Sequence, residues 1–321
     1  MKLLNKALCT ALGLAFFTTP ALAQEDKWPS KPITVIVPYT PGGSTDTVTR
    51  VVMQKLSERL GQTVVIENKP GANSTIGVTQ ASRAAGDGYT FVSILAAYAV
   101  NFSLYKLNYK AEDFVPVSHM ADLPLFLFTA KDIPAKTVPE LVEYAKTHPL
   151  TYGSSGNGSS AHMTGAHFAQ ITGLDNMVHV PYRGSAPILT DLLSGRVSMT
   201  FDPILVPMPH VKEGKLNVLG VTSAKRFESE PEIQTFEEQG YKGFVMNSWV
   251  SLLAPTGTPD AIAQRVSSEI AEIVKDPEVI EKFRGAGFVP VGSTPAELNQ
   301  LIERDRTLYK KIIDEAGITL N

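Results

Sequence analysis

The sequence is almost free of cysteine and has no cluster of positive charge. Its one cysteine, Cys9, lies within the first 23 residues, so the rest of the 321-residue chain has no thiol. Disulfides, thiol nucleophiles and cysteine-ligated metals are therefore excluded for that part. The formal net charge is −3, and no basic run of nucleic-acid-binding density occurs. We therefore expect no nucleic-acid partner.

The first 23 residues predict an export signal. Lys2 and Lys6 precede an apolar run over residues 7–17, and the segment ends in Ala-Leu-Ala at 21–23. A basic start, an apolar middle and an A-x-A end are the parts of a cleavable secretory signal. The run is far shorter than the roughly 20 residues that cross a bilayer. We expect cleavage after Ala23 and, for an exported chain without cysteine, a location in the bacterial periplasm.

Strand-like and helix-like segments alternate in the first third of the chain. Residues 33–39 (ITVIVPY) form a β-branched run typical of a strand buried on both faces. Apolar residues then recur at helical spacing over 48–60, and Gly61 is placed to end that helix. Strand-like segments at 63–67 and 89–95 repeat the scheme. The pattern predicts a doubly wound α/β unit.

The scheme restarts in the middle of the chain. Strand-like segments lie at 125–130, 150–153, 177–180, 197–201, 216–222 and 249–255, and the last third ends in two long amphipathic helices. We therefore expect two α/β lobes, each a mostly parallel sheet flanked by helices. Lobe 1 would comprise residues 24–123 and 249–321, and lobe 2 residues 124–248. Ligands of such sheets bind outside the carboxyl ends of the strands, so the expected site is the cleft between the lobes.

Two glycine-rich turns in the first third favour an anion site. PYTPGGSTD (38–46) and ENKPGANSTIG (67–77) each lead from a strand into a helix. Glycine lets backbone N–H groups approach a ligand closely, and a helix N-terminus favours negative charge. The alternative is an ordinary tight turn capped by Ser44, Thr45 or Asp46. Two such turns at adjacent strand ends favour the anion site, but the missing Lys-Ser/Thr pair of a P-loop argues against a nucleoside triphosphate.

Two further loops supply polar groups. Residues 154–160, here called the serine loop, contain four serines, and their G-x-G pattern lacks the acidic partner of a dinucleotide site. Arg183 would neutralise a carboxylate, and the following Gly-Ser pair precedes a helix. Asp202 lies shortly after, and a lone carboxylate in an anion site repels its guest unless it faces a donor group. His162 and a second histidine are five residues apart, which does not suit two metal ligands on one helical face, so we expect neither metal nor cofactor.

The order of these motifs resembles the solute receptors of tripartite tricarboxylate transporters, also called Bug receptors. The export signal is followed by WPSKPITVIVPYTPGGSTDTVTR, VVIENKPGANSTIG, GDGYTFV, YGSSGNGSSAH, VPYRGSAPILTDLLSGRV and STPAELNQLIERD. The resemblance covers essentially the whole chain after residue 23. It implies a Venus-flytrap fold of two α/β lobes that captures a small organic acid and delivers it to the integral-membrane subunits of a transporter.

The resemblance also implies which loops hold the ligand. Lobe 1 would hold a ligand carboxylate with residues 40–46 and 68–74, partly through ordered water. Lobe 2 would close on it with the serine loop, residues 183–185 and the segment at Asp202. The expected ligand-binding residues are Tyr39, Thr40, Gly43, Ser44, Thr45, Asp46, Ala72, Asn73, Ser74, Ala97, Ser154, Ser155, Ser159, Arg183, Gly184, Ser185 and Asp202.

The ligand class and two other functions stay open at this point. The ligand would be a mono-, di- or tricarboxylate, and Tyr39, Tyr98 and Phe102 either leave room for an aromatic acid or lie in the core. We expect a monomer. A secreted hydrolase using Ser155 or Ser159 with His162 is the rival, although no G-x-S-x-G elbow occurs. The third possibility is a ligand receptor for a membrane signalling partner.

Overall fold

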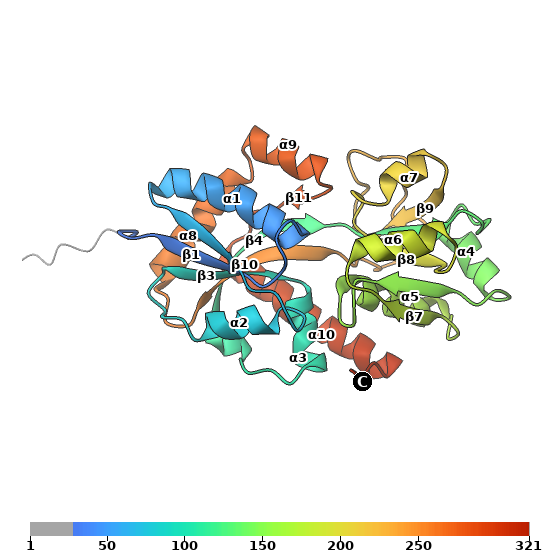
Figure 1. Ribbon diagram of the computed structural model, residues 1–321, viewed down its shortest axis with the longest axis horizontal. Coiled ribbons are helices and arrows are strands. Elements are labelled where there is room, and N and C mark those ends of the chain that lie inside the picture. Colours follow the sequence, from blue (N-terminus) through green and yellow to red (C-terminus); the bar gives the residue numbers. More distant parts are fainter. Residues whose placement is uncertain (1–27, 321) are drawn as a thin grey trace, which may run out of the picture.

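The computed structural model describes residues 28–320 as two sheets, each flanked by helices (Figure 1). The predicted signal at 1–23 lies outside the described residues. The strands are β1 (Ile33–Val37), β2 (Val64–Asn68), β3 (Thr90–Leu95), β4 (Phe114–Leu123), β5 (Phe126–Ala130), β6 (Thr151–Ser154), β7 (Val178–Pro181), β8 (Met199–Asp202), β9 (Leu216–Val221), β10 (Ser248–Pro255) and β11 (Val289–Pro290). The helices are α1 (Ser44–Leu60), α2 (Thr75–Ser82), α3 (Ala97–Leu104), α4 (Val138–Ala145), α5 (Ser160–Thr172), α6 (Ser185–Leu193), α7 (Met208–Lys212), α8 (Asp260–Ile273), α9 (Pro277–Gly285) and α10 (Pro295–Ala316).

Both sheets are mixed. The first has the order β11-β4-β10-β3-β1-β2, and the second β7-β6-β8-β5-β9. The predicted parallel pairs occur at β1 with β2 and β3, and at β6 with β7 and β8. The expectation of mostly parallel sheets is wrong in detail, because β4, β5 and β10, the strands next to the crossings between the lobes, pair antiparallel with their neighbours. The two-lobed α/β fold itself is confirmed.

Local sequence signals account for the helix ends. Gly61 ends α1 with a φ of 65°, in the left-handed region that glycine enters without strain. Thr294 and Glu297 form a capping box at the start of α10, and the Thr137 hydroxyl caps α4 by accepting the Glu140 N–H. The expectation of two helices at the end of the chain is corrected to three, since α8, α9 and α10 are separate.

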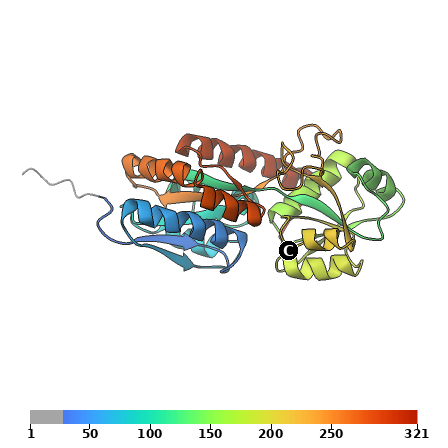
Figure 2. The ribbon, with the colours of Figure 1, turned by 90° about the horizontal axis from the view of Figure 1, so that it is seen from above.

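The lobes are joined by more than the two chain crossings. The chain passes from β4 to β5 and returns before β10. In addition, α10 packs on α3 of the first lobe and on α5 of the second, and the Gln170 side chain donates to the Ile312 carbonyl at 2.9 Å (Figure 2). The domain boundaries at 123/124 and 248/249 stay a prediction, and the sheets are consistent with them.

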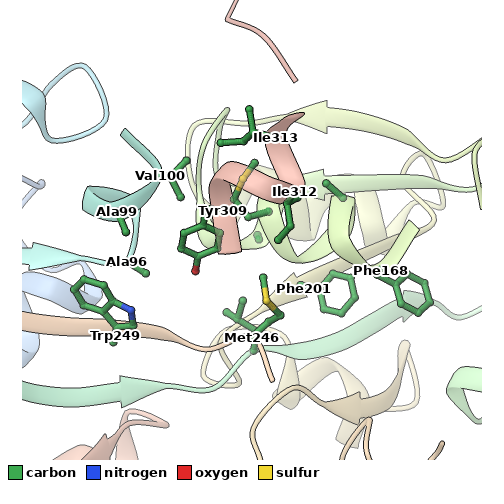
Figure 3. Packing of buried hydrophobic residues seen from close by; sticks show 14 of the residues in the cluster. Ala96, Ala99, Val100, Phe168, Phe201, Met246, Trp249, Tyr309, Ile312 and Ile313 are labelled. Atoms are coloured by element: carbon green, nitrogen blue, oxygen red, sulfur yellow. The ribbon is translucent and has the colours of Figure 1, made fainter. Parts of the chain in front are cut away.

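One hydrophobic cluster runs through both lobes. Figure 3 shows Tyr309 and Ile312 of α10 between Val100 of the first lobe and Phe168 of the second. The buried Trp249 indole donates to Asp305 of α10 at 2.7 Å. The end of α10 is thus part of the contact between the lobes. Within residues 28–320 no helix combines the length and the apolar character needed to span a bilayer.

Candidate ligand-binding cleft

A cleft of about 470 Å³ lies between the lobes, with walls from both. Most of the predicted site residues line it: Tyr39, Thr40, Gly43, Ser44, Thr45, Asn73, Ser74, Ala97, Ser155, Ser159, Arg183, Gly184, Ser185 and Asp202. Pro70, Gly71 and Ser160 also line it, inside the loops that the sequence predicted, and the lining residues that sequence reasoning missed are Pro38, Leu95, Leu123, Leu125, Ala161, Phe201, Pro203 and Ser248. Many of these are apolar residues at strand ends, which resemble core residues in the sequence.

Three predicted site residues, Asp46, Ala72 and Ser154, are not among the lining residues of the cleft. The Asp46 carboxylate accepts from Gly42 N at 2.9 Å, Arg50 Nε at 2.8 Å and Asn68 Nδ2 at 2.8 Å. Burial opposes its ionisation, but these donors outweigh burial and lower the pKa of Asp46. Asp46 therefore holds the first glycine turn in shape.

The first glycine turn leaves polar groups free at the start of α1. Gly42 has a φ of 80°, which requires glycine, whereas Gly43 has an ordinary φ of −73°. Gly43 is the residue before α1, so its missing side chain leaves the helix without a side-chain cap. The buried Thr45 hydroxyl has no hydrogen-bond partner within the described part of the chain. This end of the cleft can therefore donate both N–H and O–H groups.

The second turn is strained. Ala72, Asn73 and Ser74 have φ values of 45°, 48° and 76°, and they are the three non-glycine residues of the described chain with positive φ. Such conformations cost free energy and persist only when neighbours impose them. Asn101 of α3, fully buried, donates to the Asn73 carbonyl at 2.8 Å and accepts from the Asn73 side chain at 2.8 Å. Asn101 is thus a positioning residue, and no motif in the sequence pointed to it.

Two stacked histidines hold the serine loop. The rings of His162 and His179 lie 3.8 Å apart, centroid to centroid. Gly158 N donates to His162 Nδ1 at 3.1 Å, and His179 Nε2 lies 2.6 Å from Ser154 Oγ. Burial and the neighbouring His179 lower the pKa of His162 to about 3, and burial lowers that of His179 to about 4, so both rings are neutral. Ser154 is fully buried, so its pairing with a histidine does not expose a nucleophile.

The serine loop touches the first lobe. A Cβ placed on Gly158 would lie 3.2 Å from both Asn73 Nδ2 and Leu104 Cδ1. Ser160 Oγ also donates to Ser248 Oγ at 3.0 Å, at the start of the returning strand. The serine loop therefore already meets Asn73 of the first lobe, and the chain crossing at Ser248, along one side of the cleft.

Asp202 and Arg183 are the charged residues that line the cleft. Asp202 ends β8 and accepts from Ser185 Oγ at 2.8 Å. Burial raises the pKa of Asp202 to about 7, although the Ser185 hydroxyl favours the charged form. Arg183 is exposed, and it makes no hydrogen bond or ion pair with another residue of the described chain. Its charge is available to an anion.

Five helices begin at the cleft. The first residue of α1, α3, α5 and α6 and the residue before α2 all line it. At α1, α2, α3 and α6 no side chain caps the helix, whereas the Ser159 hydroxyl caps α5; away from the cleft, α4, α9 and α10 are capped and α7 and α8 are not. Uncapped first turns present N–H groups and the positive end of the helix dipole. The cleft is therefore built to receive a small anion.

The aromatic residues considered from sequence divide between cleft and core. Tyr39 lines the cleft. Tyr98 is buried against Tyr109 and Phe114, and Phe102 packs on Tyr98 and beneath the Arg306 guanidinium. Within residues 28–320, no group of three or more acidic, histidine or cysteine side chains could hold a metal ion.

Comparison with known proteins agrees with this geometry. Residues 48–318 match the family model of the tripartite tricarboxylate transporter family receptor. BugT from Bordetella pertussis is 34% identical, over 98% of each chain. The solved periplasmic binding protein BugD is 31% identical, with a TM-score of 0.77 over 91% of this chain and 99% of its own. Rpa4515 from R. palustris, solved with adipate, is 34% identical, with a TM-score of 0.80 over 91% of this chain and 99% of its own.

BugD is a periplasmic binding protein, and the matched family is one of transporter receptors and not of enzymes. The hydrolase alternative is thereby removed, and the protein is a solute-binding receptor. The geometry of the cleft, the match over most of the chain and the similarity of the whole fold agree: this chain belongs to the tripartite tricarboxylate transporter receptor family.

Proposed function

We propose that the protein captures a small organic carboxylate in the cleft and delivers it to the integral-membrane subunits of a tripartite tricarboxylate-type transporter. The observation that carries the proposal is the convergence of five helix N-termini on one cleft, four of them without a side-chain cap. The free Arg183 cation at the same cleft adds to the preference for an anion. Adipate bound to Rpa4515 supports a carboxylate as the ligand.

A thermal-shift screen of mono-, di- and tricarboxylates, aromatic acids included, tests the ligand class. A ligand at 100 times its dissociation constant adds about 2.7 kcal/mol to the free energy of unfolding, which the melting temperature reports clearly. Failure of every carboxylate to raise the melting temperature would contradict the proposal.

Variants at the first glycine turn test the place of binding. Gly43→Val should abolish binding, because its side chain takes up space at the cleft while its φ suits any residue. Ser44→Ala should weaken binding modestly, since it removes one hydroxyl among many donors. Ser82→Ala, at the far end of α2, is the matched control and should bind as the wild type does. Equal affinities in all three variants would place the site elsewhere.

We further propose that the receptor works as a periplasmic monomer released by cleavage after Ala23. The intact mass of protein isolated from the periplasm should correspond to a chain that starts at Gln24. A retained N-terminal segment, or an added lipid mass, would contradict the proposed cleavage.

A further inference from the structure

The two aspartates near the cleft have opposite surroundings. Asp46 receives three donors, one of them the Arg50 guanidinium, and is held as a carboxylate. Asp202 is 6% exposed and accepts one hydrogen bond, from the neutral Ser185 hydroxyl. No cation lies within ion-pair distance of Asp202 in the described chain, and its Oδ2 has no hydrogen bond from the described residues. A difference of this kind between two carboxyl groups assigns them different protonation states.

A buried carboxylate without a cation is costly, so such a group takes up a proton. A neutral Asp202 has an O–H group to donate, and Asp202 lines the cleft. An ionised Asp202 would instead repel the anion that the helix N-termini attract. The same residue therefore either opposes carboxylate binding or contributes a donor to it, depending on one proton.

None of the other ionisable groups around Asp202 in the described chain forms an ion pair or a hydrogen bond with it. Tyr39 and Arg183 are the remaining ionisable residues of the cleft lining. Asp191 of α6 accepts hydrogen bonds from Tyr182 and Arg196. On either side of β8, β5 has no ionisable residue, and β6 has Tyr152, whose ring lies by His179. The neutral pair of His162 and His179 holds the serine loop.

We propose that Asp202 is protonated in the ligand-bound receptor and donates its O–H to one carboxylate of a dicarboxylate ligand. The second carboxylate of the ligand lies at the opposite, lobe 1 end of the cleft, at the N-termini of α1 and α2. Both lobes present helix N-termini to the cleft, so a molecule with an anionic group at each end satisfies both. This inference rests on the proposed carboxylate-binding function.

The proposal fixes the direction of a pH effect. Receptor with an ionised Asp202 must take one proton from solvent when the ligand binds, and a nearby anion favours that uptake. Because burial already raises the pKa of Asp202 to about 7, uptake grows as the pH rises above 7. The affinity for a dicarboxylate therefore falls by up to about tenfold per pH unit above that value, and levels off below it.

Titration calorimetry between pH 6 and 8.5, in two buffers of different ionisation enthalpy, measures both the number of protons taken up on binding and the affinity. Succinate, malate and adipate are the dicarboxylate probes, since their second carboxyl groups titrate below pH 6 and are ionised above pH 7, and hexanoate is adipate without its second carboxylate. We expect uptake close to one proton per dicarboxylate at pH 8.5 and little at pH 6. Asp202→Asn keeps a donor of similar shape and should bind with an affinity independent of pH. Asp191→Asn, an aspartate of α6 that does not line the cleft, should keep the wild-type pH dependence.

The outcomes separate this inference from the proposed function. Dicarboxylate binding without proton uptake and with constant affinity would overturn the protonated Asp202 and leave carboxylate binding intact. Binding of hexanoate but of no dicarboxylate would do the same. An Asp202→Asn variant that keeps the wild-type pH dependence would also overturn the inference, and the proton count in the wild type decides the matter if that variant does not fold. Absence of any carboxylate binding would contradict the proposed function itself.

Discussion

Three consecutive residues of the second glycine turn are held in the left-handed conformation, and this has a measurable cost. Ala72 has a φ of 45° and is exposed, so its methyl group contributes little besides strain. Ala72→Gly should therefore raise the free energy of unfolding by about 1 kcal/mol, or the melting temperature by about 2–4 °C. Urea and thermal unfolding measure this change.

The control for this change is an exposed alanine in a right-handed helix. Ala261→Gly in α8 should lower the free energy of unfolding by about 0.5 kcal/mol, because glycine loses more backbone freedom on folding. Loss of stability in both variants would show that Ala72 is not strained. A more mobile turn should also weaken ligand binding in Ala72→Gly, since Asn73 and Ser74 line the cleft.

The stacked histidines predict how stability depends on pH. Their pKa values, about 3 and 4 in the folded protein, lie below the value of about 6.5 in an unfolded chain. As the pH falls below 6.5, the two histidines bind protons in the unfolded chain but not in the folded protein, so the free energy of unfolding falls. Asp202 acts in the opposite direction between pH 7 and 4, because its raised pKa lets the folded protein bind a proton first. The net expectation is a loss of stability toward pH 4.5.

Urea unfolding at pH 7, 6 and 5 checks this expectation by difference. His162→Leu removes one of the two histidines that stay neutral in the folded protein. The free energy of unfolding should therefore fall less steeply, as the pH is lowered, than in the wild type. His148→Gln, at an exposed histidine, is the control and should keep the wild-type slope. Identical slopes in all three proteins would mean that the buried pair does not resist protonation.

Among the elements, those marked by local patterns could be predicted, and those defined by distant partners could not. The apolar run of β1 and the glycine at the end of α1 indicated their elements directly. The longest strand, β4, was missed because Pro116, Ser118 and His119 interrupt its apolar pattern, and its partner β10 lies far along the chain. Sequence order also cannot show that β10 returns antiparallel.

The candidate site follows the same division. Glycine and serine motifs located the loops that line the cleft, because loop composition is a local property. Hydrogen bonds within the fold decide which of these side chains are free to face the cleft. Arg50 and Asn68 are hydrogen-bonded to Asp46, and His179 is hydrogen-bonded to Ser154. Asn101 holds the strained turn from a helix with no motif of its own.

The end of α10 contributes buried side chains to the contact between the lobes, and this contribution can be tested by itself. Ile312 is 1% exposed and belongs to the cluster that includes Phe168 of α5. Ile312→Ala should lower the free energy of unfolding by about 2–4 kcal/mol, through lost burial and the cavity left behind. Ile171→Ala, at an exposed isoleucine of α5, should change it by less than about 0.5 kcal/mol. Equal, small effects of both changes in urea unfolding would contradict this role of α10.

At the scale of the whole molecule, we predict that ligand binding closes the lobes. Neither lobe alone can surround a small acid, because the polar loops of the cleft are divided between them. Closure would bend the chain at the crossings near 121–124 and 247–249. Small-angle scattering should show a smaller radius of gyration with a saturating dicarboxylate. An unchanged radius at saturation would favour a rigid, preformed pocket.

The helix α10 is a third connection between the lobes, in addition to the two chain crossings. It reaches the second lobe at α5, and in both views it lies to one side of the strands that cross between the lobes (Figures 1 and 2). Two crossing strands alone would allow both hinge bending and a twist of one lobe relative to the other. A third attachment beside them would oppose the twist and leave the hinge bending. The last turns of the chain, distant in sequence from every ligand-lining loop, would then limit how far the two lobes can open.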